Sequence, residues 1–254
     1  MPIGSRTQRG GEDTIDRATE GRHALGKSLN LTASDGHCLD AYRADPAGTP
    51  VGGVVVIQEI FGVNHHIRSV CDRLAAEGYA AVAPALFDRH TRDFQSGYSP
   101  EEIEKARKFV ANPDWDAMLR DTAAAIAELE GAGPVSMVGF CMGGTVTFLS
   151  AARLDGLSAA SGYYGGRIVA FAEEKPRCPT QLHFGDQDQS IPMTDVETIK
   201  RVRPDCDIHV YQGAGHGFHC DERGSYHEPS SRLAWQRTLA WFKRAREQGA
   251  RKAG

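Results

Sequence analysis

The sequence has no long hydrophobic run and no cluster of one charge. None of its 254 residues form a stretch of 18 apolar side chains, and no charged-then-apolar leader opens it, so we expect neither a membrane span nor a secretory signal. The 29 Lys and Arg and 33 Asp and Glu are intermixed and give a net charge of −4. Without a basic stripe, nucleic acid is not an expected partner.

Cysteine is sparse and scattered. The six cysteines are Cys38, Cys71, Cys141, Cys178, Cys206 and Cys220. This spacing in a medium-sized chain favours reduced thiols in a cytoplasmic setting over a disulfide scaffold. The pairs His65-His66 and His216/His219 have no carboxylate or cysteine at recognisable ligand spacing. We therefore expect no metal.

Strand and helix patterns alternate along the chain, which predicts an α/β fold with a mostly parallel sheet. Residues 1–25 are almost devoid of apolar side chains and are expected to form a disordered tail, leaving 26–248 as one domain. Alternating stretches on both sides of Asp35-Gly36 predict an antiparallel hairpin at a sheet edge. The other expected strands are 54–57, 79–83, 135–138, 157–164, 180–184 and 208–211. The expected helices follow Asn64, span 115–129 and 145–153, and close the chain around 233–242.

Residues 86–114 interrupt this alternation with charged and aromatic side chains and one charged helix over 101–110. Two interpretations stay open. The segment could cover an active-site crevice, because loops after the carboxyl ends of strands border ligand sites in α/β sheets. It could equally be a surface insertion.

The stretch 135–144 predicts a short buried strand, a sharp turn and a helix. Gly139 and Gly143 flank Cys141 at two residues' distance on either side, which is the G-x-S-x-G nucleophile elbow with cysteine in place of serine. The amide of Met142 would then point at a developing oxyanion. A buried structural cysteine is the other interpretation. The dinucleotide fingerprint G-x-G-x-x-G is not present, and no cofactor is expected.

Three loops after predicted strands each offer one catalytic residue type. Cys141 comes first, Asp186 or Asp188 second, and His216 third. This is the chain order of the α/β-hydrolase triad, and such loops can converge at one sheet edge. We favour Asp188 as the acid, with Asp186 accepting loop amides. An imidazolium beside a thiol favours the thiolate, which is the nucleophilic form.

Six segments, in order, resemble the dienelactone hydrolase (carboxymethylenebutenolidase) family. They are QEIFGVN at 58–64, GYAAVAP at 78–84, GFCMGG at 139–144, GYYG at 162–165, Asp188 with Pro192, and AGHGF at 214–218. The resemblance covers roughly residues 28 to 245. It implies a single-domain α/β-hydrolase fold, and cleavage of a cyclic enol ester through an acyl-thioester in chloroaromatic breakdown.

The resemblance also implies roles for single residues. It places the triad on Cys141, Asp188 and His216, and the oxyanion donors on the amides of Met142 and Ile60.

It gives Glu59 a contact with the resting thiol that is released when substrate binds. Burial of a carboxylate is costly without a partner, so a thiol or an arginine near Glu59 is expected on either ground. Tyr163 matches a tyrosine that lines the family's pocket, and Phe61 and Phe218 from the same segments are expected substrate contacts.

Two positions depart from the family pattern. The acid that follows the strand-ending proline in the family is Ala85 here. The arginine four residues after the histidine, which helps to hold a substrate carboxylate, is Cys220 here. Arg89 and Arg223 are the expected substitutes, with Arg92 and Arg107 as further candidates.

The expected partner is therefore a small-molecule ester or lactone, with or without a carboxylate. A thioesterase or other acyl hydrolase with the same triad stays open, as does a non-catalytic small-molecule-binding protein of this fold. The chain is expected to be a monomer or a small homo-oligomer.

Overall fold

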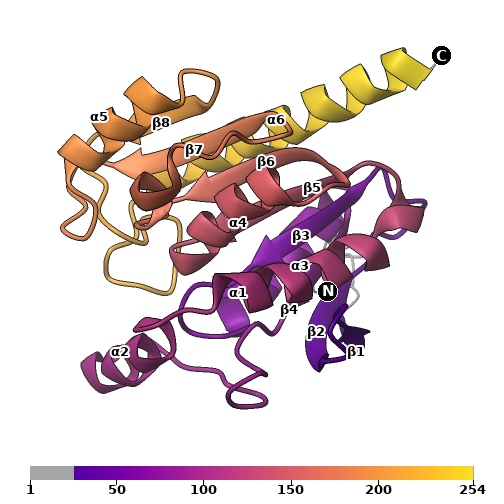
Figure 1. Cartoon of the computed structure of the whole chain (residues 1–254), viewed down its shortest axis with the longest axis horizontal. Coiled ribbons are helices and arrows are strands. Elements are labelled where there is room, and N and C mark those ends of the chain that lie inside the picture. The colour runs from indigo at the N-terminus through magenta and orange to yellow at the C-terminus, as the bar shows by residue number, and fades with distance from the viewer. Residues whose placement is uncertain (1–25, 254) are drawn as a thin grey trace, which may run out of the picture.

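A computed structural model describes residues 26–253, so the expected tail at 1–25 lies outside the described residues. One eight-stranded sheet in the order β1-β2-β4-β3-β5-β6-β7-β8 forms the centre of the molecule (Figure 1). Its strands are β1 Lys27–Thr32, β2 Cys38–Ala44, β3 Gly53–Ile57, β4 Ala80–Pro84, β5 Val135–Phe140, β6 Leu157–Tyr163, β7 Thr180–Gly185 and β8 Asp207–Tyr211.

Six strands, β3 to β8, run parallel to one another, and β2 pairs antiparallel with β4. The edge hairpin of β1 and β2 is antiparallel and turns at Gly36, whose φ is +83°. Glycine suits this turn because side chains disfavour that backbone region. The predicted α/β fold, its mostly parallel sheet and its edge hairpin are confirmed.

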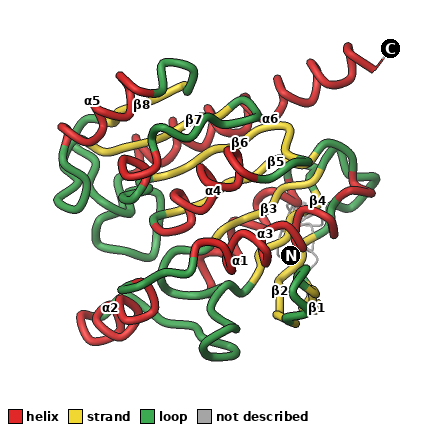
Figure 2. The backbone as a smooth tube through the Cα atoms, in the orientation of Figure 1, coloured by secondary structure: helices red, strands yellow, loops and turns green. Residues whose placement is uncertain are grey.

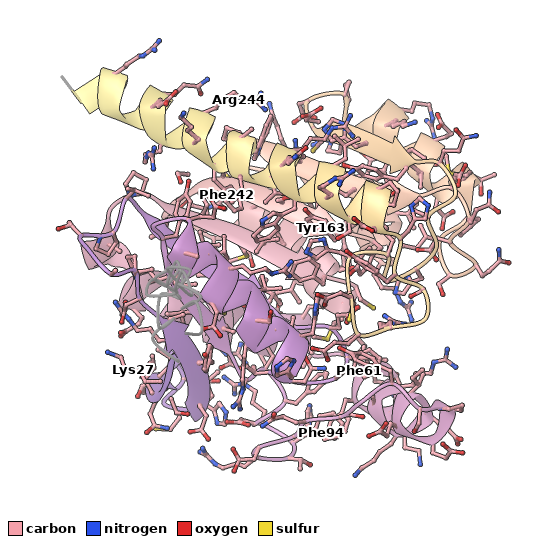
Figure 3. The ribbon with its side chains drawn as sticks, turned by 180° about the vertical axis from the view of Figure 1, so that it is seen from behind. Lys27, Phe61, Phe94, Tyr163, Phe242 and Arg244 are labelled. Carbon is pink, nitrogen blue, oxygen red and sulfur yellow. The ribbon has the colours of Figure 1, made fainter. Side chains whose placement is uncertain are left out.

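Helices cover both faces of the sheet. Helices α1 and α6 lie over one face (Figure 3), and α3 and α4 lie over the other (Figure 1). The helices are α1 His65–Ala76, α2 Pro100–Arg107, α3 Trp115–Glu128, α4 Met142–Arg153, α5 Met193–Val202 and α6 Glu228–Ala253, with short 3-10 turns η1 Lys108–Val110, η2 Glu130–Ala132 and η3 Ile168–Phe171. Helix α6 runs past 248, the predicted end of the domain.

The central strand β3 shows why the predicted strands form. All five of its residues are buried. Val54 and Val56 pack into the cluster with α1 and α6, while Val55 and Ile57 pack into the cluster with α3. A β-branched run that is apolar on both faces is typical of a parallel strand between two helical layers.

Helix α4 begins at Met142, three residues before the predicted start at Thr145. Gly143 and Gly144 therefore lie in its first turn rather than in a loop. A Cβ atom on Gly143 would stand 2.5 Å from the carbonyl oxygen of Gln58, and one on Gly144 would stand 2.4 Å from that of Tyr163. These glycines allow the helix to approach its neighbours closely.

The segment 86–114 is mostly loop around α2 (Figure 2). The predicted helix over 101–110 is divided into α2 and η1. Asn64 caps α1 through the amide of Ile67, and its Nδ2 donates to the carbonyl of Ser96 and the hydroxyl of Tyr98. The segment is thereby fixed beside the loop that follows β3. Within residues 26–253, no helix has both the length and the apolar character that crossing a membrane requires.

Candidate active site

Cys141 occupies a strained turn between β5 and α4. Its φ is +55° and its ψ is −116°, a region that costs a non-glycine residue roughly 1–3 kcal/mol and persists only where the surroundings enforce it. Gly139 allows this turn to be tight. A Cβ atom at position 139 would lie 2.1 Å from the carbonyl oxygen of Gly143, so only glycine permits the close approach of these two backbone segments. The thiol is thus held out at the carboxyl end of the sheet.

His216 lies between Cys141 and Asp188. Its Nε2 is 3.1 Å from Cys141 Sγ, and its Nδ1 is 2.8 Å from Asp188 Oδ2. The other oxygen of Asp188 accepts hydrogen bonds from the amides of Ser190 and Ile191, which fixes the carboxylate. The three groups predicted from chain order therefore meet at the ends of β5, β7 and β8.

The second candidate acid, Asp186, has a different position. Its Oδ1 accepts a hydrogen bond of 2.7 Å from the amide of Gly213. This contact stabilises the loop after β8, as we expected for Asp186.

The electrostatics of this group favour a charged imidazole. Burial opposes the charge on His216, but the adjacent Cys141 and the hydrogen bond to Asp188 outweigh it and raise the pKa of His216 to about 10. A cation beside the sulfur favours the thiolate form of a cysteine.

Two backbone amides border the same space. Ile60 and Met142 both line the cavity that contains Cys141. The amide of Met142 is in the first turn of α4, where no intrahelical acceptor exists. Among the described residues, the amide of Ile60 donates to no backbone carbonyl. Neither amide has a backbone acceptor among the described residues, and their role as oxyanion donors stays a prediction.

The cavity measures about 370 Å³. One wall comes from the segment 86–114, through Ile103, Arg107 and Val110. The interpretation of this segment as a surface insertion is therefore wrong, since it borders the cavity of Cys141. Trp115, at the start of α3, is half-buried and lines the cavity as well.

Glu59 and Arg223 form an ion pair at the wall of the cavity. Arg223 Nη1 donates to Glu59 Oε1 at 3.0 Å, and the Glu59 side chain is 2% exposed. Of the two partners expected for Glu59, the arginine is the one found, while the thiol of Cys141 faces His216. Phe61 lies under the guanidinium at 5.4 Å and lines the cavity.

Three predicted substrate contacts are placed elsewhere, which corrects them. Tyr163 is buried beneath α6 (Figure 3), where its hydroxyl bonds to Thr238 at 2.8 Å. Phe218 is buried against the rings of neighbouring tyrosines. Arg89 is held by Asp121. All three side chains have their partners within the protein, and none of them lines the cavity.

Residues that the sequence did not single out lie at the site instead. The ring of Tyr164 lies 5.1 Å from that of His216, one residue after the tyrosine that we expected. Arg167, Thr145 and Ser190 line the cavity. Tyr164 follows the end of β6, and its φ of +37° turns it away from the strand alternation, which the sequence pattern alone does not indicate.

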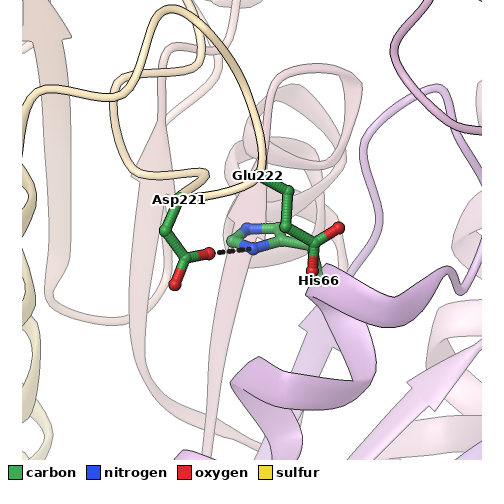
Figure 4. A group of neighbouring side chains, drawn as sticks. All are labelled: His66, Asp221 and Glu222. Atoms are coloured by element: carbon green, nitrogen blue, oxygen red, sulfur yellow. Dashed lines mark ion pairs between the residues drawn. The ribbon is translucent and has the colours of Figure 1, made fainter.

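His66, the second residue of the histidine pair at 65–66, lies beside the carboxylates of Asp221 and Glu222 (Figure 4). His66, Asp221 and Glu222 each offer one ligand atom, and these atoms lie within 4.8 Å of one another. Burial opposes the charge on His66, but Asp221, 3.4 Å from its Nδ1, with Cys220 and Glu59 raises the pKa of His66 to about 9. A protonated His66 imidazole explains why two carboxylates lie beside it without a metal ion. The expectation of no metal stays a prediction.

A parallel sheet between helical layers, with a strained cysteine turn and a histidine at its carboxyl edge, defines an α/β-hydrolase. The model of the dienelactone hydrolase family matches residues 39–246. The chain belongs to this family and is a hydrolase of the dienelactone hydrolase type.

Individual relatives agree with this assignment. A Synechocystis sp. protein named "Putative carboxymethylenebutenolidase" is 38% identical over 80% of this chain and 91% of its own. The Pseudomonas putida carboxymethylenebutenolidase is 31% identical over 85% of this chain and 95% of its own. The crystal structure titled as a putative dienelactone hydrolase from Klebsiella pneumoniae matches with a TM-score of 0.76 and 33% identity, over 87% of this chain and 99% of that one.

Proposed function

We propose that this hydrolase cleaves a small-molecule carboxylic ester or lactone with Cys141 as nucleophile, through an acyl-thioester. The observation that carries the proposal is the position of His216, 3.1 Å from Cys141 Sγ and 2.8 Å from Asp188. Nucleophile, base and orienting acid at such distances are the requirement for covalent acyl transfer.

In the first half-reaction, the sulfur of Cys141 forms a bond to the carbonyl carbon and the carbonyl oxygen becomes an anion. The amides of Ile60 and Met142 stabilise this oxyanion. As the ester C–O bond breaks, the imidazolium of His216 protonates the leaving oxygen. In the second half-reaction, His216 takes a proton from water, the hydroxide attacks the thioester, and the thiolate leaves with a carboxylic acid as product.

Relatives named carboxymethylenebutenolidase support a lactone as one substrate. The pocket supports a small molecule, since about 370 Å³ lies in the range of sites for small ligands.

The test is turnover of a panel of 4-nitrophenyl esters, lactones and thioesters by Cys141→Ala and by Cys38→Ala, a matched variant at an exposed cysteine. We expect Cys141→Ala to lose at least about 10³-fold in kcat, as nucleophile removal does in related triads. Cys38→Ala should keep the wild-type rate. Retention of full activity by Cys141→Ala on every substrate cleaved would exclude this mechanism.

Labelling with iodoacetamide at neutral pH separates an enzyme from a non-catalytic binding protein. Burial raises the pKa of the Cys178 thiol to about 11 and that of Cys206 to about 12, so both should react slowly. Cys141 should be labelled first, because the imidazolium of His216 stabilises its thiolate. Equal labelling of the accessible cysteines would contradict a catalytic role.

A further inference from the structure

Thr145 places a buried hydroxyl at the wall of the cavity that contains Cys141. It is 1% exposed, whereas Ser190, the other hydroxyl of the lining, is exposed. Thr145 lies at the end of the first turn of α4, three residues after Met142. Because side chains of a helix lean toward its N-terminus, that of Thr145 lies over the turn formed by Cys141 and Met142.

The loop after β6 fixes the position of this hydroxyl. Thr145 Oγ1 accepts a hydrogen bond of 3.2 Å from the backbone amide of Arg167. The two backbones are in close contact here, since a Cβ atom on Gly165 would lie 2.9 Å from the amide nitrogen of Thr145. Backbone groups of α4 and of the loop therefore hold the hydroxyl in place, and the exposed guanidinium of Arg167 has no part in this contact.

The proton of the hydroxyl has no acceptor within the described part of the chain. A threonine hydroxyl has one proton to donate and two lone pairs that accept. In a helix it often donates to the carbonyl four residues earlier, which is that of Cys141 here. Among residues 26–253, however, the amide of Arg167 is the one hydrogen-bond partner of Thr145 Oγ1. Since buried donors are nearly always paired, a ligand in the cavity is the acceptor that completes the set.

The apolar side chains around the cavity make this donor selective. Ile60, Val110 and Trp115 are part of the same wall. A neutral oxygen that enters such a wall gives up its hydrogen bonds to water, which is costly unless the protein replaces them. A fixed donor therefore favours a ligand with an oxygen at that place over one with a methylene group.

We propose that Thr145 is a specificity-determining residue whose hydroxyl donates a hydrogen bond to an oxygen in the acyl chain of the bound ester. The favoured substrates then carry an ether, hydroxyl or carbonyl oxygen close to the reacting carbonyl. This inference rests on the proposed function of Cys141. The alcohol part must lie within reach of His216, which protonates the leaving oxygen, and Thr145 borders the other side, between α4 and the loop after β6.

The test is an oxygen scan along the acyl chain. The substrates are 4-nitrophenyl esters of methoxyacetic, 3-methoxypropanoic and 4-methoxybutanoic acids, each paired with the alkanoate that has a methylene in place of the ether oxygen. The measured quantity is the ratio of kcat/KM within each pair, divided by the same ratio for hydrolysis by hydroxide, which removes the intrinsic activation by the oxygen. In the wild type, one oxygen position should give a ratio about three- to tenfold above the others, the range for one neutral hydrogen bond.

Thr145→Val keeps the shape of the side chain and removes the hydroxyl, so it should abolish this preference. Thr145→Ser keeps the hydroxyl and should retain it within about twofold. A general effect of either variant on the cavity cancels in the ratio. Thr122→Val is the matched control, because Thr122 is buried in α3 and does not line the cavity. It should leave the ratio unchanged at every oxygen position.

Equal ratios in the wild type and Thr145→Val, or an equal loss in Thr145→Ser and Thr145→Val, would overturn the inference while ester hydrolysis stands. A second pair, 2-methoxyethyl acetate and butyl acetate, places the oxygen in the alcohol part. A Thr145-dependent preference in this pair alone would overturn the assignment to the acyl side.

If no ester is cleaved, the proposed function fails, and the contact is measured separately by calorimetry. The methyl esters of the same acids then serve as ligands of Cys141→Ala. The favoured methoxy ester should bind about three- to tenfold more tightly than its alkanoate, and adding Thr145→Val should remove the difference. Equal binding of the two ligands to Cys141→Ala would overturn the inference.

Discussion

Arg223 donates a hydrogen bond of 3.0 Å to Glu59, which lies 164 residues earlier in the chain. The guanidinium also lies over the rings of Phe61 and Tyr98, at 5.4 and 5.7 Å. This contact joins the loop after His216 to the loop after β3, and both loops border the cavity of Cys141. A buried carboxylate is thereby neutralised close to the thiol.

Arg223→Gln should destabilise the protein by about 2–4 kcal/mol, because it leaves Glu59 buried without a counter-charge. Glu59 Oε2 has no hydrogen-bond partner among the described residues, so the arginine is its main compensation. The double variant Glu59→Gln/Arg223→Gln should recover part of this loss. Urea unfolding of the wild type, Glu59→Gln, Arg223→Gln and the double variant gives the coupling energy between the two side chains. Arg177→Gln is the surface control. Additive losses in the double variant would contradict the pairing.

Asp188→Asn should lower kcat by about 10²–10⁴-fold, since an amide cannot hold the required tautomer of His216. It should also shift the alkaline limb of kcat/KM to lower pH, because Asp188 helps to raise the pKa of His216. Asp186→Asn is the matched control and should affect stability by about 1 kcal/mol through the amide of Gly213. A pH profile that moves equally in both variants would argue against the assignment of Asp188.

Gly139→Ala should destabilise the protein by at least about 3 kcal/mol and displace the cysteine turn. Its Cβ would meet the carbonyl oxygen of Gly143 at 2.1 Å and Thr147 Oγ1 at 2.4 Å. Gly131→Ala, where no heavy atom lies within 4 Å of the new Cβ, is the matched control and should be nearly neutral. Thermal unfolding and activity are the two measurements. Wild-type stability in Gly139→Ala would show that the elbow can relax.

His66 should make stability depend on pH between about 6.5 and 9. Its pKa is raised from 6.5 to about 9 in the folded protein, so its contribution is complete below pH 6.5 and is lost as the pH rises through about 9. The difference in unfolding free energy between wild type and His66→Gln should shrink by about 1–3 kcal/mol over this interval. His90→Gln, at an exposed histidine, should show no such trend. A pH-independent difference would mean that His66 is neutral in the fold.

Local patterns predicted much of the fold. The run Val54 to Ile57 predicts a buried parallel strand, and Asp35-Gly36 predicts the edge hairpin, because both signals depend on neighbours along the chain. The sequence pattern places the start of α4 three residues too late, because Gly143 and Gly144 resemble turn residues. Their real constraint is the approach of Gln58 and Tyr163, which no local pattern contains.

The sequence by itself determined the alternation of strands and helices, the glycine-flanked position of Cys141, and the order of Cys141, Asp188 and His216 along the chain. Only the tertiary structure decided that Arg223 pairs with Glu59, that Arg89 is bound by Asp121, and that Tyr164 faces His216. The reason is physical: backbone conformation follows from adjacent residues, whereas the partner of a charged side chain depends on which distant loops the sheet brings to the same edge.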